Sequence, residues 1–273
     1  RGDVVRVGEH FLRSHFGVPH ADGDSWRVSI SGGAGGGMSL GIEEMKSFPI
    51  VSAVVVLECA GHRRSELEPR AEGVPWQVGA VSHAEWRGCR LRDVIAAANP
   101  TTEARAVVLV GADRGDVKHR PEAEHFARAI PLDDPVIDDV ILAREMNGKP
   151  LAPEHGFPVR AIVPGWYGVA SVKWLSEIHF VGSPFEGYFQ AVDYRLLLDG
   201  DEPPGTEITK MPVNSLIVTP TNGESVRQGA LEVTGIAWAD GTPVVGVEVR
   251  CDAGPWKQAR LENPRDRFAP FRF

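Results

Sequence analysis

The sequence is poor in cysteine and has no long apolar run. Its three cysteines, Cys59, Cys89 and Cys251, lie far apart and form no CxxC pair. This spacing excludes zinc ribbons, thioredoxin-type redox pairs and c-type haem attachment, and it argues against a disulfide framework. No segment approaches the roughly 20 apolar residues that a membrane-spanning helix needs.

The sequence also has no excess of basic residues. The formal net charge is −8, with acidic and basic residues interspersed, so no basic stripe indicates nucleic acid or an anionic membrane as a partner. We expect neither, and we expect any anion-binding site to be a local arginine cluster. The chain begins at Arg1, so the compartment stays open, with the cytoplasm slightly favoured over the periplasm.

Two conspicuous patterns lack the context that a functional site needs. The glycine-rich run GGAGGG at residues 32–37 has no following Lys-Ser/Thr, so we expect a hairpin tip and not a phosphate loop. His10, His15 and His20 recur every five residues, which fits neither a helical face nor strand alternation. A zinc cluster is not expected there.

Up to about Leu198 the sequence mixes strand and helix patterns. Runs rich in β-branched residues predict strands at residues 51–57, 106–110 and 159–163. Apolar spacing predicts one helix through Leu91, Val94, Ile95 and Ala98, and another through Ile42, Met45 and Phe48, capped by Ser39. Regular βαβ repeats are missing, so the fold class predicted is α+β.

The composition changes after residues 199–206, DGDEPPGT, which we expect to be an exposed linker. Strand candidates at residues 215–219, 231–238 and 244–250, separated by Asn-Gly and Asp-Gly turns, predict an antiparallel β-sandwich. Val245, Val247 and Val249 alternate with other residues and predict one core face. We therefore divide the chain into domains at residues 1–205 and 206–273. The second has fewer residues than the roughly 100 of an immunoglobulin-like sandwich, so we expect it to be incomplete.

The segment ECAGHRRSE, residues 58–66, carries the most chemical information. A β-branched strand delivers Cys59 to a sheet end, where Ala-Gly lets the backbone turn. Arg63 and Arg64 then favour the thiolate, which is the form that ligates a soft metal or acts as a nucleophile. The alternative is an unreactive core cysteine beside arginines that only pair with nearby glutamates.

This segment resembles the molybdenum-ligating loop of the sulfite oxidase family, which includes eukaryotic nitrate reductases and reads close to CAGNRR at this place. Four further segments resemble that family in the same order: FLRSH (11–15), GVPWQVGAVSHAEWRG (73–88), EMNGKPLAPEHGFPVRAIVPG (145–165) and VASVKWL (169–175). The resemblance implies a molybdopterin-binding domain with mixed β-sheets. An immunoglobulin-like β-sandwich that makes a homodimer contact would follow it.

The resemblance implies molybdenum and molybdopterin as cofactors, with Cys59 as the metal ligand. A soft thiolate suits a metal that is also bound by the dithiolene sulfurs of a pterin. The pterin ring and phosphate would be held by Phe11, Leu12, Arg13, Ser14, His15, Asp113, His155, Arg160, Ser171, Val172 and Lys173. Arginine and lysine suit the phosphate, and histidine and aspartate suit ring nitrogens. For His155, the alternative is a satisfied buried histidine.

The resemblance also implies a substrate pocket made by Arg13, Arg64 and Trp76. The two arginines would bind an oxyanion, and the tryptophan would exclude water and so strengthen those charges. Plain core packing is the alternative for Trp76.

Departures from the family pattern bear on the substrate. Phe126 stands where an active-site tyrosine is usual, and Gly246 stands where sulfite oxidases carry a third anion-binding arginine. Tyr167 is a candidate to supply the missing hydroxyl from another loop. His62 replaces the usual asparagine and adds a group that titrates near neutral pH. Sulfite affinity is therefore expected to be weakened.

The activity that the resemblance implies is oxygen-atom transfer to sulfite or a related small substrate. Electrons would pass to an external acceptor such as a cytochrome, because the chain has no haem-attachment motif and no Rossmann fingerprint. Two alternatives remain: reduction of an oxyanion or S- or N-oxide at the same site, and a non-catalytic β-sandwich binding protein with a degenerate first domain.

Overall fold

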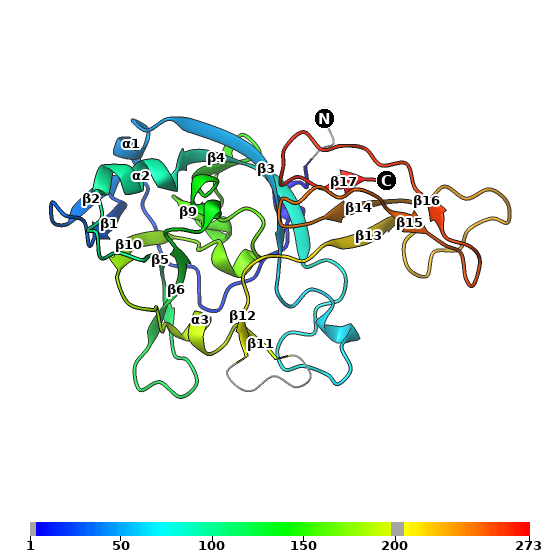
Figure 1. Ribbon diagram of the computed structural model, residues 1–273, viewed down its shortest axis with the longest axis horizontal. Coiled ribbons are helices and arrows are strands. Elements are labelled where there is room, and N and C mark those ends of the chain that lie inside the picture. The colour runs from blue at the N-terminus through cyan, green and yellow to red at the C-terminus, as the bar shows by residue number, and fades with distance from the viewer. Residues whose placement is uncertain (1–3, 198–204) are drawn as a thin grey trace.

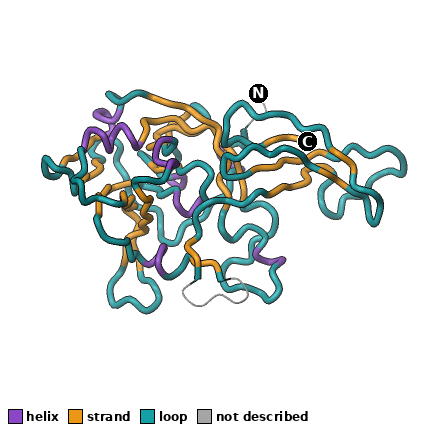
Figure 2. Tube along the Cα trace, viewed as in Figure 1, coloured by secondary structure: helices purple, strands orange, loops and turns teal. Residues whose placement is uncertain are grey.

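The computed structural model describes residues 4–197 and 205–273 and shows two β-rich units packed side by side (Figure 1). We call residues 4–197 the N-terminal unit and residues 205–273 the C-terminal β unit. Strands and loops dominate both, and the helices of the described ranges are short and lie in the N-terminal unit (Figure 2). No helix within these ranges is long and apolar enough to cross a membrane.

The first sheet of the N-terminal unit has five strands in the order β2-β1-β10-β5-β6. Their bounds are Arg27–Ser31 (β1), Met38–Gly41 (β2), Ala106–Gly115 (β5), Glu124–Pro131 (β6) and Leu175–Val181 (β10). β1 and β10 are parallel and the other neighbours are antiparallel, so the sheet is mixed. Residues 32–37 connect the antiparallel pair β1 and β2, which confirms the predicted hairpin tip.

The second sheet has the order β3-β4-β7-β8, with β9 also pairing with β7. Its bounds are Ile50–Glu58 (β3), Val81–Arg90 (β4), Ile141–Met146 (β7), Lys149–Pro150 (β8) and Arg160–Ile162 (β9). β3 is the predicted β-branched strand, extended at both ends, and it stops one residue before Cys59. The strand predicted at residues 159–163 forms, but it is shorter.

The helices are α1 (Ile42–Met45), α2 (Leu91–Ala98), α3 (Tyr188–Ala191) and the 3₁₀ turns Val7–Glu9 (η1), Arg64–Glu66 (η2), Pro135–Asp138 (η3), Pro153–His155 (η4) and Gly168–Ala170 (η5). α2 is the predicted helix and buries its apolar face. The prediction for α1 was wrong at both ends. Gly41 is its N-cap, because the Glu44 carboxylate accepts the Gly41 N–H at 2.6 Å, whereas Ser39 belongs to β2. The helix ends before Phe48.

The main core lies between the two sheets. It joins side chains from both sheets and from α2, including Ile30, Leu91, Leu109, Leu142 and Ile178. Each fully buried side chain of this kind contributes roughly 1.5–3 kcal/mol to folding. The mixed sheets with short helices confirm the α+β class, and the core they share fixes the strands β5 and β9, whereas β3 packs in a separate cluster through Val55 and Leu57.

The C-terminal β unit is a three-stranded sheet of order β13-β14-β17 with a separate hairpin, β15-β16. The bounds are Asn214–Thr219 (β13), Thr234–Trp238 (β14), Glu248–Val249 (β15), Lys257–Gln258 (β16) and Phe271–Arg272 (β17). The predicted strands at 231–238 and 244–250 are therefore shorter than expected. The predicted inward face was also wrong, because residues 243–247 are not in a strand: Val245 is 97% exposed and Val244 is 9% exposed.

The expected linker falls mostly outside the described residues. Of residues 199–206, only Gly205 and Thr206 are described, and Thr206 begins β12 (Thr206–Glu207), which pairs with β11 (Arg195–Leu196). This short ladder ties the start of the C-terminal β unit back to the N-terminal unit.

Candidate active site

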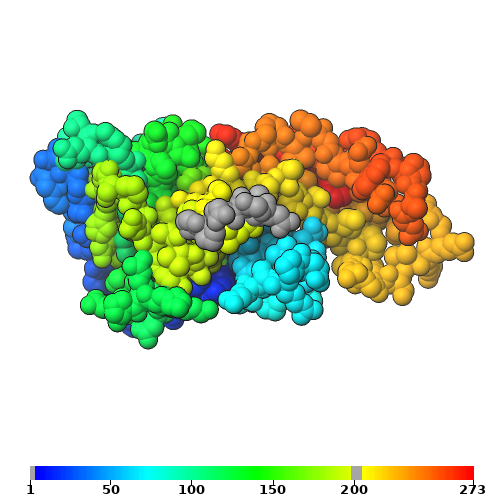
Figure 3. Space-filling view, turned by 60° about the horizontal axis from the view of Figure 1, so that its bottom comes forward, coloured from blue at the N-terminus to red at the C-terminus, as the bar shows by residue number. Residues whose placement is uncertain are grey.

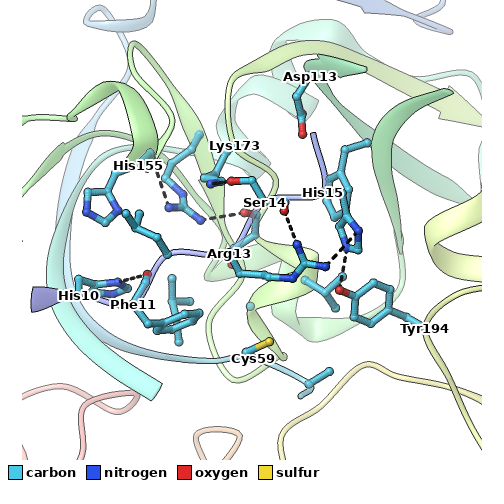
Figure 4. Close-up of a pocket in the computed structure, with 18 residues that line it drawn as sticks. His10, Phe11, Arg13, Ser14, His15, Cys59, Asp113, His155, Lys173 and Tyr194 are labelled. Atoms are coloured by element: carbon cyan, nitrogen blue, oxygen red, sulfur yellow. Dashed lines mark hydrogen bonds between the residues drawn. The ribbon is translucent and has the colours of Figure 1, made fainter. Parts of the chain in front are cut away.

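A pocket in the N-terminal unit lies beside the end of β3 (Figure 4). Its lining comes from segments far apart in the sequence: His10, Phe11, Leu12, Arg13, Ser14, His15, Leu57, Cys59, Ala60, Asp113, Phe126, His155, Arg160, Gly168, Val169, Ser171, Lys173 and Tyr194. Every predicted cofactor residue except Val172 is in this lining. Val172 is fully buried in the main core and supports the pocket from behind.

Cys59 presents its sulfur to the pocket from the loop after β3 (Figure 4). The residue is 9% exposed, and the Gly61 N–H lies 3.4 Å from Sγ, where it can donate to the sulfur. Burial raises the pKa of the thiol, while that N–H, Arg13 and Arg64 lower it by less. Arg64 thus favours the thiolate, as expected, but desolvation of the charged form outweighs it, so the protein without a metal favours the thiol. A bound metal would supply the missing positive charge.

Two cations lie at the pocket wall without an ion-pair partner among the described residues: Arg160, which is buried, and Lys173, which is half-buried. Each contacts an aromatic ring, Arg160 that of Trp86 and Lys173 that of Trp174. The Arg160 guanidinium is 5% exposed and donates to the carbonyl oxygens of His155 (3.0 Å) and Ser171 (2.9 Å). Lys173 donates to Ser14 Oγ and, at 3.0 Å, to Glu154 O. Burial lowers the pKa of Arg160 to about 9, and burial together with the Arg160 charge lowers the pKa of Lys173 to about 7.

Carbonyl oxygens and aromatic rings do not neutralise a desolvated cation, so this arrangement suits an anion. A phosphate is the anion that a guanidinium and an ammonium suit best.

Two polar side chains of the same pocket, His10 and Asp113, are buried, and His10 has incomplete hydrogen bonding. His10 is 5% exposed, its Nδ1 contacts the Phe11 carbonyl oxygen at 3.2 Å, and its buried Nε2 has no partner. Burial lowers the pKa of His10 to about 3 and raises the pKa of Asp113 to about 6. Orphaned buried polar atoms are rare in folded proteins. They fit a ring with its own donors and acceptors, such as a pterin.

A hydrogen-bonded row crosses the pocket from Arg13 through His15 to Tyr194 (Figure 4). The Arg13 Nη2 lies 3.4 Å from His15 Nδ1, and His15 Nε2 lies 2.8 Å from the Tyr194 hydroxyl. Burial, with smaller contributions from Arg13 and Lys173, lowers the pKa of His15 to about 4. His15 is therefore neutral near pH 7.

Tyr194 and His10 were missed by the sequence reasoning. Phe126 does line the pocket, and Tyr194 brings a hydroxyl to the same lining, whereas Tyr167, the candidate from the sequence, is not among the lining residues. Tyr194 follows α3 and lies outside every block that carried the resemblance. The signal that could have found His10 was its place directly before the FLRSH block.

Three predicted catalytic residues lie outside the pocket lining. Arg64 and Trp76 contact the same space beside Gly61: a Cβ there would lie 3.0 Å from Arg64 Cζ and 3.1 Å from Trp76 Cδ1. Arg64 also donates to the Val74 carbonyl oxygen at 3.3 Å. Tyr167 packs in the cluster with Met211 and Trp238 of the C-terminal β unit, and burial, Glu58 and Cys59 raise its pKa to about 12.

Comparisons with known proteins agree with this geometry. The family model "oxidoreductase molybdopterin binding domain" matches residues 15–189, and "Mo-co oxidoreductase dimerisation domain" matches residues 206–271. The fold and the pocket thus define a molybdopterin-binding oxidoreductase. The chain belongs to the sulfite oxidase family.

Relatives and a solved structure show how far the similarity reaches. Mitochondrial sulfite oxidase of Homo sapiens is 38% identical over 94% of this chain and 49% of its own length. Nitrate reductase [NAD(P)H] of Hordeum vulgare is 35% identical over 96% of this chain and 32% of its own. The sulfane dehydrogenase SoxCD of Paracoccus pantotrophus matches with a TM-score of 0.84 at 27% identity, covering 100% of this chain and 68% of that chain. This chain thus spans about half the length of human sulfite oxidase.

Proposed function

We propose that this protein is a molybdenum-cofactor oxidoreductase that transfers an oxygen atom to sulfite or a related small substrate and passes the electrons to an external acceptor. The observation that carries the proposal is one pocket that combines the Cys59 sulfur with two cations that have no ion-pair partner among the described residues. A soft ligand and a phosphate site in one cavity match a metal held by a phosphorylated pterin.

Different lining residues would bind different parts of the molybdenum–pterin group. Cys59 would ligate the metal, Arg160 and Lys173 would bind the phosphate, and His10 and Asp113 would hydrogen-bond the ring. When bound, the molybdenum–pterin group supplies the two-electron redox chemistry of oxygen-atom transfer. The protein's part is to hold the group, orient the substrate and exclude water.

The row from Arg13 to Tyr194 would orient an anionic substrate. A guanidinium only donates hydrogen bonds, so neutral His15 accepts at Nδ1 and carries its proton on Nε2. That N–H then donates to the Tyr194 oxygen at 2.8 Å, which leaves the hydroxyl proton of Tyr194 free to donate into the pocket. Arg13 and Tyr194 can in this way present two donors to one small oxyanion.

The substrate is proposed to be a small anion that needs few cations. Arg13 lines the pocket, and Arg64 would add charge from behind Gly61 with Trp76 as an apolar neighbour. Gly246, at the place of the family's third arginine, is exposed and supplies no charge. Losing one charged partner typically costs a few kcal/mol, so sulfite binding should be weaker than with three arginines.

We also propose two domains, residues 1–205 and 206–273, with the second an immunoglobulin-like β-sandwich that makes a homodimer. The match of residues 206–271 to the dimerisation domain supports this, as do large apolar side chains exposed on that part, including Val213 (70%) and Ile217 (49%). Sedimentation velocity of the full chain tests it, and a monomer at micromolar concentration would contradict it.

The test of the function is molybdenum and pterin content of protein from its natural host, followed by a substrate screen that begins with sulfite. About one molybdenum and one pterin per chain, lost in Cys59→Ser, is the expected result. Folded protein with neither would overturn the proposal. Activity should be followed with an artificial one-electron acceptor, so that the natural partner is not needed.

A further inference from the structure

A tryptophan of the C-terminal β unit reaches the residue directly before the metal ligand. Trp238, at the end of β14, is 1% exposed, and its Nε1–H donates to Glu58 Oε2 at 2.8 Å. Asn214 of β13 donates to the other carboxylate oxygen, Oε1, at 3.1 Å. Glu58 is 2% exposed, and both of these donors lie on the C-terminal β unit. The carboxylate is thus held across the boundary between the two units.

The same tryptophan contacts the loop on the far side of Cys59. The rings of Trp238 and His62 meet edge to face with centroids 6.1 Å apart. The backbone N–H of His62 in turn donates to the Cys59 carbonyl oxygen at 2.8 Å. Both ring nitrogens of His62 are buried without a partner, so packing against neighbours such as Trp238, and not hydrogen bonding, holds this ring.

Further contacts bind this loop and its strand to the C-terminal β unit. Arg63 Nη2 lies 3.5 Å from the Ser215 carbonyl oxygen, and the Val56 N–H donates to the Phe268 carbonyl oxygen at 3.0 Å. Val56 also packs in one cluster with Met211 and Trp238. In Figure 1, β3 runs toward β13 and β14 where the two units meet. In Figure 3, the cyan loop region after β3 lies against the yellow part of the C-terminal β unit.

The contact between the two units depends on the buried Glu58 carboxylate. If the two units moved apart, Glu58 would lose both donors, and a buried group without its partners costs the full desolvation penalty. Cys59 follows Glu58 directly, so displacement of Glu58 would shift the backbone that aims the sulfur. Small displacements of a ligand weaken a metal site because its geometry is narrow.

We propose that Trp238 is a positioning residue for the metal site: through Glu58 and His62 it fixes the backbone on both sides of Cys59, so that retention of the metal depends on the C-terminal β unit. The inference rests on the proposed role of Cys59 as molybdenum ligand. It adds that the part of the chain assigned to dimerisation is also needed to complete the cofactor site.

The test compares Trp238→Phe with Trp256→Phe in the full chain. Trp256 is 56% exposed and stacks with Arg250, so it offers the same substitution in the same unit away from Glu58. The rate of molybdenum loss during prolonged dialysis should rise about tenfold or more in Trp238→Phe, because a hydrogen bond to a charged group is removed. The electron paramagnetic resonance signal of the reduced metal should also change shape. Trp256→Phe should match the wild type in both.

A conservative change at Glu58 separates positioning from general loss of stability. Glu58→Gln keeps an oxygen that accepts from Trp238 but turns its NH2 group toward the Asn214 donor, so its rate of molybdenum loss should lie between that of the wild type and that of Glu58→Ala, which should lose the metal as Trp238→Phe does. Thermal unfolding of each variant shows whether it is folded. If Trp238→Phe does not fold, Asn214→Ala, which removes the other donor to Glu58, is measured in its place.

The outcomes for the two proposals are distinct. Wild-type protein without molybdenum would overturn the proposed function and this inference with it. Wild-type protein that contains molybdenum, with folded Trp238→Phe or Asn214→Ala indistinguishable from Trp256→Phe in metal loss and in the resonance signal, would overturn the inference alone. Loss of metal in Glu58→Ala with a smaller loss in Glu58→Gln would support it.

Discussion

Replacing Tyr194 by phenylalanine removes the hydroxyl that the structure places at the end of the Arg13–His15 row. Two effects are expected. The buried His15 Nε2–H loses its 2.8 Å acceptor, which should lower the free energy of unfolding by about 1–3 kcal/mol. The substrate loses a donor that acts on a developing or existing negative charge, worth about 1.5–3 kcal/mol, so kcat/KM should fall roughly 10- to 150-fold.

The assay is steady-state sulfite oxidation with an artificial acceptor, with each rate divided by the molybdenum content of the sample. Tyr188→Phe is the matched control, because Tyr188 is a buried tyrosine of the neighbouring helix α3 that does not line the pocket. It should keep kcat/KM within about twofold, since it removes no donor to the substrate. If Tyr194→Phe, loaded with molybdenum, kept the wild-type kcat/KM, the reasoning that gives Tyr194 a donor role would be refuted.

Three further predictions follow from the charges and close contacts. Arg13→Lys should raise KM for sulfite about tenfold with little change in kcat, measured in the same assay, because an ammonium cannot replace a bidentate guanidinium. In cofactor-free protein the folded state loses the Lys173 proton near pH 7, whereas the unfolded chain keeps it to about pH 10.5, so stability should rise across that window. Lys173→Met should remove that slope from the thermal unfolding midpoint. Gly88→Ala should destabilise the fold by about 3 kcal/mol or prevent folding, because the new carbon would lie 1.9 Å from the Leu142 carbonyl oxygen. Gly35→Ala, where no atom lies within 4 Å, should leave the unfolding midpoint nearly unchanged.

The elements that the sequence predicted best are those with a strong local signal. β3 combines a run of valines with a following Ala-Gly, and α2 combines helical apolar spacing with a left-handed Asn99 (φ 47°) at its end, so local preference and burial agree. The errors lie where tertiary contacts decide. The start of α1 depends on a carboxylate that reaches back to Gly41, and Val245 lies in a segment without a ladder partner to impose alternation.

The site was predicted well where it lies inside contiguous motifs and poorly elsewhere. Cys59, Arg160 and Lys173 were found because each sits in a block that resembles the family. Tyr194 was missed because its role depends on α3 and on a contact to His15, 179 positions away in the sequence. The net ionisation of the Cys59 thiol could not be predicted for a related reason: charges can be read from the sequence, whereas burial, which dominates that pKa, comes only from the fold.

The charges of the pocket also connect cofactor binding with the stability of the fold. Burial disfavours the charges of Arg160 and Lys173, and the Arg160 charge further disfavours that of Lys173. A phosphate bound at these residues would offset both effects and would stabilise only the folded state, by an amount that grows with its concentration relative to Kd. Lys173→Met would remove the cost of desolvating this charge and so stabilise the cofactor-free fold. The same substitution would weaken the proposed phosphate site. Two neighbouring cations without an ion-pair partner among the described residues are therefore explained by the proposed phosphate site better than by the packing of the core.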